Sequence, residues 1–203
     1  MKINSKNKYK FKDLLSIYKK TYPEFDSDFA EDLIKVFGVN VKERFSKAST
    51  GYQSIMKIIL ALCNPSEYIF MDEPVLGLDA NHRHIFNKKL LEAYARNPRT
   101  FVIATHLIEE VASILEKVIV IKDGVVTEEV LVEDVLRKGY VVSGASTLVE
   151  EYVADKKVLE TDRIGNFTRS VVIGAIGEAQ PGLEFSPLTL QDYFISITRK
   201  ENE

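Results

Sequence analysis

Apolar residues recur at helical spacing along the first third of the chain. They come three or four positions apart in residues 11–22 and again after Asp26 or Ser27, either of which suits a helix N-cap. Gly38 suits the end of that second helix, because glycine readily adopts the left-handed conformation that follows many helices. Residues 51–62 are apolar on nearly every side, which indicates a buried helix. The pattern therefore predicts three helices in this part.

Short apolar runs alternate with further helical stretches in the middle of the chain. Residues 68–71 and 100–105 are strand-like runs between polar residues, which is typical of parallel strands covered on both faces. Helical patterns follow them in residues 80–96 and 107–115. This alternation of strands and helices predicts an α/β sheet.

The pattern changes again towards the C-terminus. Residues 118–130 predict a hairpin that turns at Asp123-Gly124. Beyond residue 132, short strands and short helices mix, and we expect them to form a small C-terminal α/β appendage. The expected strands are 141–142, 157–160 and 169–173, and the expected helices are 133–138, 145–154 and 189–198.

Composition and charge narrow the class of protein. The 203 residues are 45% hydrophobic and 28% charged with a net charge of −3, which fits a globular chain and argues against a nucleic-acid partner. One cysteine, Cys63, fits a reducing cytoplasm and a place in the core. The apolar run 58–63 is far shorter than the roughly 20 residues of a membrane span, and no signal-peptide pattern occurs. We expect a cytoplasmic protein whose connection to a membrane comes through a partner.

Two adjacent carboxylates, Asp72 and Glu73, end the first predicted strand, and Pro74 stops it. The carboxyl ends of strands in an open α/β sheet border the crevice where such sheets bind ligands. Two carboxylates there suit a divalent metal ion and water chemistry, with one holding the ion and the other taking a proton. Without further context, a solvated pair of loop acids explains the same residues.

Three nearby features supply that context. Gly77-Leu78-Asp79 follows the carboxylates within a few residues, and His106 comes directly after the second predicted strand. Upstream, Ser49-Thr50-Gly51 begins the buried helix, where free backbone N–H groups and a hydroxyl make a ready anion site.

Together these residues resemble the ATP-binding-cassette (ABC) ATPase family. Ser49-Thr50-Gly51-Tyr52 is similar to a degenerate family signature, Asp72-Glu73 to Walker B with its catalytic glutamate, Gly77-Leu78-Asp79 to the D-loop, and His106 to the switch histidine. The signature serine and the Walker B aspartate stand 72 − 49 = 23 positions apart. The catalytic glutamate and the switch histidine stand 106 − 73 = 33 positions apart, and both spacings suit the family. The C-terminal part more weakly resembles the YtrB-like bacterial exporter subgroup.

The resemblance implies a fold and its organisation. We expect a partial P-loop NTPase (ABC) fold with a mostly parallel sheet, a helical subdomain and a small C-terminal α/β appendage. The implied segments are the helical subdomain with the signature at 1–66, the Walker B, D-loop and H-loop part of the RecA-like lobe at 67–132, and the appendage at 133–203.

The resemblance also implies roles for single residues in ATP hydrolysis. Glu73 and His106 would be catalytic, with Glu73 as general base and His106 on the γ-phosphate. Asp72 would hold Mg²⁺ through water. Ser49 and Gly51 would contact ATP held by a second ABC ATPase subunit. Asp79 would couple the two subunits. The resemblance also implies a transmembrane permease subunit as the membrane partner.

One family motif is not found in this sequence. A P-loop has the pattern G-x-x-x-x-G-K-[ST], and the two glycine pairs at that spacing, Gly139 with Gly144 and Gly177 with Gly182, lack the lysine. We therefore expect the N-terminal Walker A part to be absent and this chain alone to be inactive. The alternative is a non-catalytic, signature-bearing module that binds no ATP by itself. A third reading, an ABC ATPase of DNA repair or translation, lacks the expected coiled-coil heptads.

The same motif bears on the sheet. In the family fold the Walker A strand lies between the strand before His106 and the strand at 118–122. Without it, the sheet has a gap or unpaired edges, which invite aggregation or complementation by another chain. We expect either marginal stability or a rearrangement in which those two strands meet directly.

Overall fold

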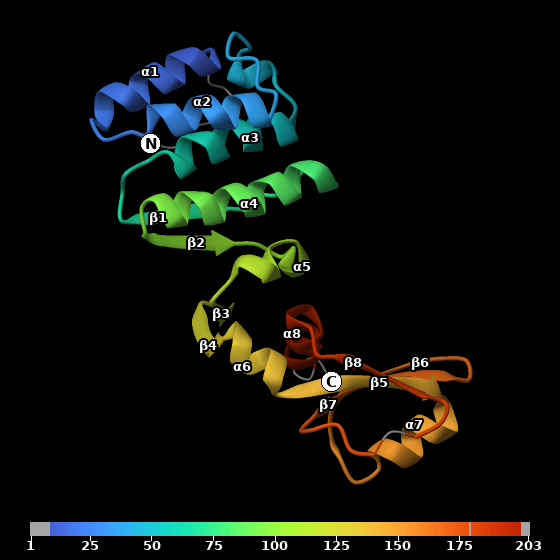
Figure 1. Cartoon of the computed structure of the whole chain (residues 1–203). Helices are drawn as coiled ribbons and strands as arrows, with labels where there is room; N and C mark the ends of the chain where they lie inside the picture. The colour runs from blue at the N-terminus through green and yellow to red at the C-terminus, as the bar shows by residue number, and fades with distance from the viewer. Residues whose placement is uncertain (1–8, 179, 200–203) are drawn as a thin grey trace. The chain divides into compact units, whose positions relative to one another are not determined.

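The computed structural model describes residues 9–178 and 180–199, which form two compact units. The first unit ends at Ile114 and the second begins at Leu115. This boundary falls inside the segment 67–132, so the three-part organisation stays a prediction. Figure 1 labels the helices and strands of both units.

The first unit contains helices and one pair of strands. Its elements are α1 (Phe11–Thr21), α2 (Ser27–Val36), the 3₁₀ turn η1 (Phe45–Lys47), α3 (Thr50–Leu62), β1 (Tyr68–Asp72), α4 (Ala80–Arg96), β2 (Thr100–Ala104), α5 (Ile108–Val111) and the 3₁₀ turn η2 (Ala112–Ile114). The predicted helix at 107–115 is thus two short helical turns, while the other helices and strands expected here are confirmed within one or two residues.

Local chemistry explains where the helices begin and what they bury. Asp26, one of the two N-caps that the sequence allows, caps α2 by accepting a hydrogen bond from the Phe29 N–H at 2.9 Å. Gly38 follows α2 with φ +65°, the left-handed conformation expected at a helix end. Helix α3 lies at the centre of the unit, and six of its apolar residues are buried: Ile55, Met56, Ile58, Ile59, Leu60 and Leu62.

Strands β1 and β2 pair in parallel, with Tyr68 opposite Thr100 and Asp72 opposite Ala104. The prediction that both faces of these strands are covered is wrong. Side chains of β1 alternate between buried and exposed, and Phe70 is 74% exposed. In the described residues β1 and β2 pair only with each other, and the side chains on one face of β1 stay exposed.

The second unit contains a hairpin and an antiparallel sheet. Its elements are β3 (Lys117–Lys122), β4 (Val125–Leu131), α6 (Val132–Arg137), β5 (Gly139–Ala145), α7 (Ser146–Val153), β6 (Lys157–Ile164), β7 (Phe167–Ile173), β8 (Leu183–Pro187) and α8 (Leu190–Arg199). The four-stranded sheet has the order β6-β7-β5-β8. Its apolar core is formed by Tyr140, Val142, Val149, Tyr152 and Val172.

The hairpin forms as predicted, and one strand was not foreseen. Asp123 and Gly124, with φ of 50° and 77°, make the tight turn between β3 and β4. Strand β8, which pairs with β5 from Leu183 to Pro187, could not be predicted from the pattern, because its apolar residues are few and a proline ends it. The α/β class is confirmed, with parallel pairing in β1 and β2 and antiparallel pairing in the other described ladders.

The expected direct pairing of the strand before His106 with the strand at 118–122 is not among the ladders of the described residues. Strand β2 pairs with β1, and β3 pairs with β4, in two separate sheets. The alternative expectation, marginal stability, stays a prediction. No helix in the described part of the chain is both long and apolar enough to cross a membrane.

A charged cluster links α2 to α4 in the first unit. The ammonium of Lys89 lies 2.6 Å from Asp32 Oδ2 and 2.8 Å from Glu92 Oε2, and the Lys89 side chain is only 12% exposed. Burial opposes the charge on Lys89, but the hydrogen bonds with Asp32 and Glu92 outweigh it and raise the Lys89 pKa. The hydrogen bond from Lys89 lowers the pKa of Glu92.

We predict that Lys89→Met destabilises the first unit by roughly 1–2 kcal/mol at neutral pH, because Asp32 and Glu92 both lose their hydrogen bond from Lys89. Because the Glu92 pKa is lower in the folded chain, the ionised Glu92 stabilises the fold at a pH above its ordinary pKa of about 4.3. This stabilisation is lost as the pH falls through the lowered pKa. The difference from wild type should therefore shrink below about pH 4. Urea unfolding followed through α2 and α4 amide signals measures it. Lys88→Met, at an exposed neighbour, is the control, and equal stability of both variants at pH 7 would contradict the prediction.

Candidate functional site

Glu73 follows β1 directly and has an unusual backbone conformation. Its φ is 46°, in the left-handed region that costs most residues about 1 kcal/mol. Its N–H donates to the Ala104 carbonyl at 2.8 Å, which continues the pairing of β1 with β2 by one residue. The chain then turns away from the strand, and the Glu73 side chain is directed to the loop after β2.

That side chain contacts the residues at the end of β2. Glu73 Oε1 accepts hydrogen bonds from the His106 backbone N–H at 3.1 Å and from His106 Nδ1 at 2.6 Å. Glu73 Oε2 accepts the Thr105 hydroxyl at 2.8 Å. The structure thus brings together two residues that stand 33 positions apart in sequence, both at the carboxyl ends of paired parallel strands.

These contacts set the charge state of the carboxylate. Partial burial disfavours ionisation of Glu73, but the hydrogen bonds from His106 and Thr105 together outweigh it and hold the Glu73 pKa below its ordinary value. The side chain of Glu73 is 28% exposed and that of His106 is 68% exposed. Glu73 is therefore an ionised carboxylate at neutral pH, within reach of solvent.

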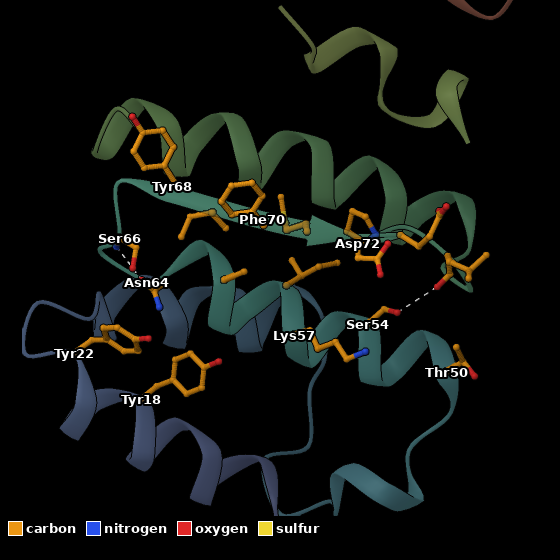
Figure 2. Close-up of a pocket in the computed structure, with 17 residues that line it drawn as sticks. Tyr18, Tyr22, Thr50, Ser54, Lys57, Asn64, Ser66, Tyr68, Phe70 and Asp72 are labelled. Carbon is orange, nitrogen blue, oxygen red and sulfur yellow. Dashed lines mark hydrogen bonds between the residues drawn. The ribbon is translucent and has the colours of Figure 1, made fainter. Parts of the chain in front are cut away.

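Asp72 lies beside a pocket of about 550 Å³. Figure 2 shows Asp72, Phe70 and Tyr68 along β1, with Lys57 on α3 and Tyr18 on α1 on the other side of the pocket. Within the described residues the Asp72 carboxylate makes no hydrogen bond or ion pair. An exposed carboxylate without a partner, next to an open pocket, is available for an external ligand.

The start of α3 packs against the turn after Glu73. A Cβ added to Gly51 would lie 2.2 Å from the Gly77 carbonyl oxygen, and Gly77 itself has φ +78°. The Ser54 hydroxyl donates to the Leu76 carbonyl at 3.3 Å, a bond drawn in Figure 2. The two candidate motifs around Gly51 and Gly77 are therefore one packed structure, and this contact alone requires glycine at position 51.

Ser49 and Asp79 both cap helices. Ser49 Oγ accepts from the Tyr52 N–H at 3.2 Å at the start of α3. Asp79 Oδ1 accepts from the His82 N–H at 2.8 Å at the start of α4, and its Oδ2 lies 2.9 Å from His82 Nδ1. The structure places Ser49 and Gly51 at the start of α3 and Asp79 at the start of α4, and none of the three contributes a hydrogen bond to the Glu73 and His106 pair.

Several contacts were not anticipated from the sequence. Tyr52, which stands where the family signature has glutamine, hydrogen-bonds through its hydroxyl to the Asn40 N–H. Thr105 received no role from the sequence, although its position directly before His106 was the available signal for its contact with Glu73. Cys63 is buried as expected, and burial raises the pKa of its thiol.

Known proteins resemble the chain in sequence and in fold. The ABC transporter ATP-binding protein YtrB of Bacillus subtilis is 25% identical over 156 residues, 77% of this chain and 49% of YtrB. The ABC transporter ATP-binding protein NatA of the same organism is 33% identical over 96 residues, 46% of this chain and 39% of NatA. A putative cobalt transport ATP-binding protein of known structure covers 96% of this chain, with a TM-score of 0.61, 17% identity and 66% of its own length matched. No protein-family model matches the chain.

The fold is thus that of part of an ABC ATPase cassette. In sequence the chain is related to the ABC transporter ATP-binding proteins, with YtrB among its relatives. It spans about half the length of YtrB and less than half of NatA.

We predict that Gly51→Ala destabilises the first unit by about 1–3 kcal/mol, because the added methyl group overlaps the Gly77 carbonyl and forces the backbones apart. Urea unfolding measures the change. Gly177→Ala serves as the control, since its Cβ would meet only the Tyr152 hydroxyl at 3.4 Å, an ordinary contact. If both alanine variants unfold at the same urea concentration as wild type, the close approach does not constrain position 51.

Proposed function

We propose that this chain is the catalytic C-terminal part of the ATP-hydrolysing subunit of an ABC transporter. The contact between Glu73 and His106 at the ends of two paired parallel strands carries the proposal. The likeness in sequence to ABC transporter ATP-binding proteins supports it. Hydrolysis would be in-line attack of water on the γ-phosphate, forming a new P–O bond as the bond to ADP breaks.

Glu73 would take the proton of the attacking water. Its carboxylate is ionised and partly exposed, as a general base must be. An ionised carboxylate only accepts hydrogen bonds, so His106 Nδ1 carries the proton in the contact with Glu73. A second donation, from Nε2 to a phosphate oxygen, then requires the doubly protonated imidazolium. Such a doubly protonated ring would suit an anionic γ-phosphate.

Asp72 is the residue we propose for Mg²⁺. Its unpartnered carboxylate beside the pocket fits a metal ion that takes oxygen ligands and usually keeps waters and substrate phosphates in its shell. Among the described residues no group of three or more potential metal ligands occurs, which fits a single protein carboxylate. Bound Mg²⁺ would neutralise charge on the phosphates.

The signature-like loop would face a second subunit. The N–H groups of Thr50 and Gly51 begin α3 and donate to no described residue, so they can bind a phosphate held by the partner, together with Ser49. The Asp79 side chain is 66% exposed and can meet that partner while capping α4. A second ABC ATPase subunit and a transmembrane permease are the proposed partners, with the chain peripheral on the cytoplasmic face of the membrane.

We predict that Glu73→Gln lowers kcat for ATP at least about 100-fold and leaves Mg-ATP binding unchanged, because glutamine keeps the shape but cannot take a proton. The variant is measured in a chimera that places the P-loop half of a related cassette before residue 10. Glu67→Gln, an exposed acid before β1, is the matched control. Wild-type turnover in Glu73→Gln would overturn the catalytic assignment.

A non-catalytic, signature-bearing module is the second candidate. The observation in its favour is that neither glycine pair at P-loop spacing is followed by lysine. We predict that the chain alone binds Mg-ATP with a dissociation constant weaker than about 1 mM, as expected where backbone N–H groups do not wrap the phosphates. Titration calorimetry measures it. Micromolar binding by this chain alone would refute the module, whereas no binding together with an inactive chimera would favour it.

A further inference from the structure

Thr105 occupies a particular position between Glu73 and the loop after β2. Its hydroxyl oxygen lies 2.8 Å from Glu73 Oε2 and 3.0 Å from the backbone nitrogen of Leu107. The Leu107 N–H can only donate, so it uses the acceptor side of the hydroxyl. The Thr105 hydroxyl hydrogen is therefore left to donate to Glu73. The Leu107 backbone N–H thus fixes the direction of the hydrogen bond between Thr105 and Glu73.

The lone pairs of the Glu73 carboxylate are used unequally. Each carboxylate oxygen offers about two acceptor sites. Oε1 accepts two hydrogen bonds from His106 and is filled. Oε2 accepts one, from Thr105, and keeps one site. Within the described contacts Oε2 is the oxygen with room for a proton from water.

Three donors from the consecutive residues Thr105 and His106 bind the Glu73 carboxylate. Because they bind both of its oxygens, they fix the orientation of the carboxylate plane. His106 holds one oxygen and Thr105 the other, while the Glu73 backbone is bound to Ala104. Without Thr105, the carboxylate could rotate about the oxygen held by His106. The Thr105 contact therefore decides where the free site of Oε2 points.

We propose that Thr105 is a positioning residue, whose hydroxyl holds the Glu73 carboxylate so that Oε2 presents its remaining acceptor site to the attacking water. The inference that water is attacked there rests on the proposed function. The holding of the carboxylate by Thr105 does not, and it is tested separately.

The first test uses the chain as it is, with the signals of the Glu73 carboxyl carbon and the His106 backbone amide followed by NMR. Thr105→Val removes the hydroxyl at nearly constant size and should shift both signals, while Thr105→Ser should restore them. Thr100→Val, at the exposed start of β2, is the matched control and should leave both unchanged. Amide signals of Ile69 and Ile103 check that the strand pair is intact. Unshifted Glu73 and His106 signals in Thr105→Val overturn the proposal.

The second test uses the chimera that hydrolyses ATP. Thr105→Val should lower kcat about tenfold with KM unchanged, since a misdirected base affects the chemical step and not binding, and Thr105→Ser should recover most of it. Normal kcat in Thr105→Val, with Glu73→Gln inactive, overturns the role of Thr105 and leaves the proposed function standing. Normal kcat in Glu73→Gln overturns the proposed function instead, and the NMR signals then decide alone whether Thr105 holds the carboxylate.

Discussion

The parallel pairing of β1 with β2 is the constraint on which the site depends. Because parallel strands end at the same edge, pairing Asp72 with Ala104 puts the residues that follow each strand side by side. The hydrogen bond from Glu73 to Ala104 carries this alignment one residue beyond the strand. A shift of one residue in register would move Glu73 by about 3.3 Å relative to His106 and separate them. The backbone pairing of β1 with β2 thus places Glu73 next to His106, and the hydrogen bonds of the two side chains then fix their relative orientation.

A second constraint joins the other two motifs. The backbones of Gly51, at the start of α3, and Gly77, in the turn after Glu73, approach so closely that no side chain fits between them. Ser54 adds a hydrogen bond across the same contact. The residues proposed to meet a partner's nucleotide are therefore mechanically connected to the turn that leaves Glu73. Any change in the start of α3 on binding a partner has a direct path to Gly77, four residues from the proposed base.

Much of this could be predicted from the sequence, and the failures have physical reasons. Helices α2 and α4 were placed correctly because Asp26 and the apolar spacing act locally. The resemblance named Glu73 and His106 as catalytic, and the pairing of β1 with β2 in the structure brings the two side chains into contact. The exposure of Phe70 could not be foreseen, since an apolar run does not tell which neighbours will cover it. Strand β8 was missed because its pairing with β5 depends on distant residues, and the Gly51 contact because close approach of two backbones leaves no pattern in either segment.

The left-handed backbone of Glu73 has an evolutionary consequence. Glycine or asparagine would adopt φ 46° at lower cost, so the backbone conformation does not favour glutamate at this position. In relatives that do not need a carboxylate at position 73, we expect substitutions to glycine or asparagine to accumulate there. Related sequences can be sorted on that basis. Those that keep glutamate retain a residue that the backbone conformation disfavours, and those that have exchanged it for glycine or asparagine have gained a more relaxed turn but lost the carboxylate.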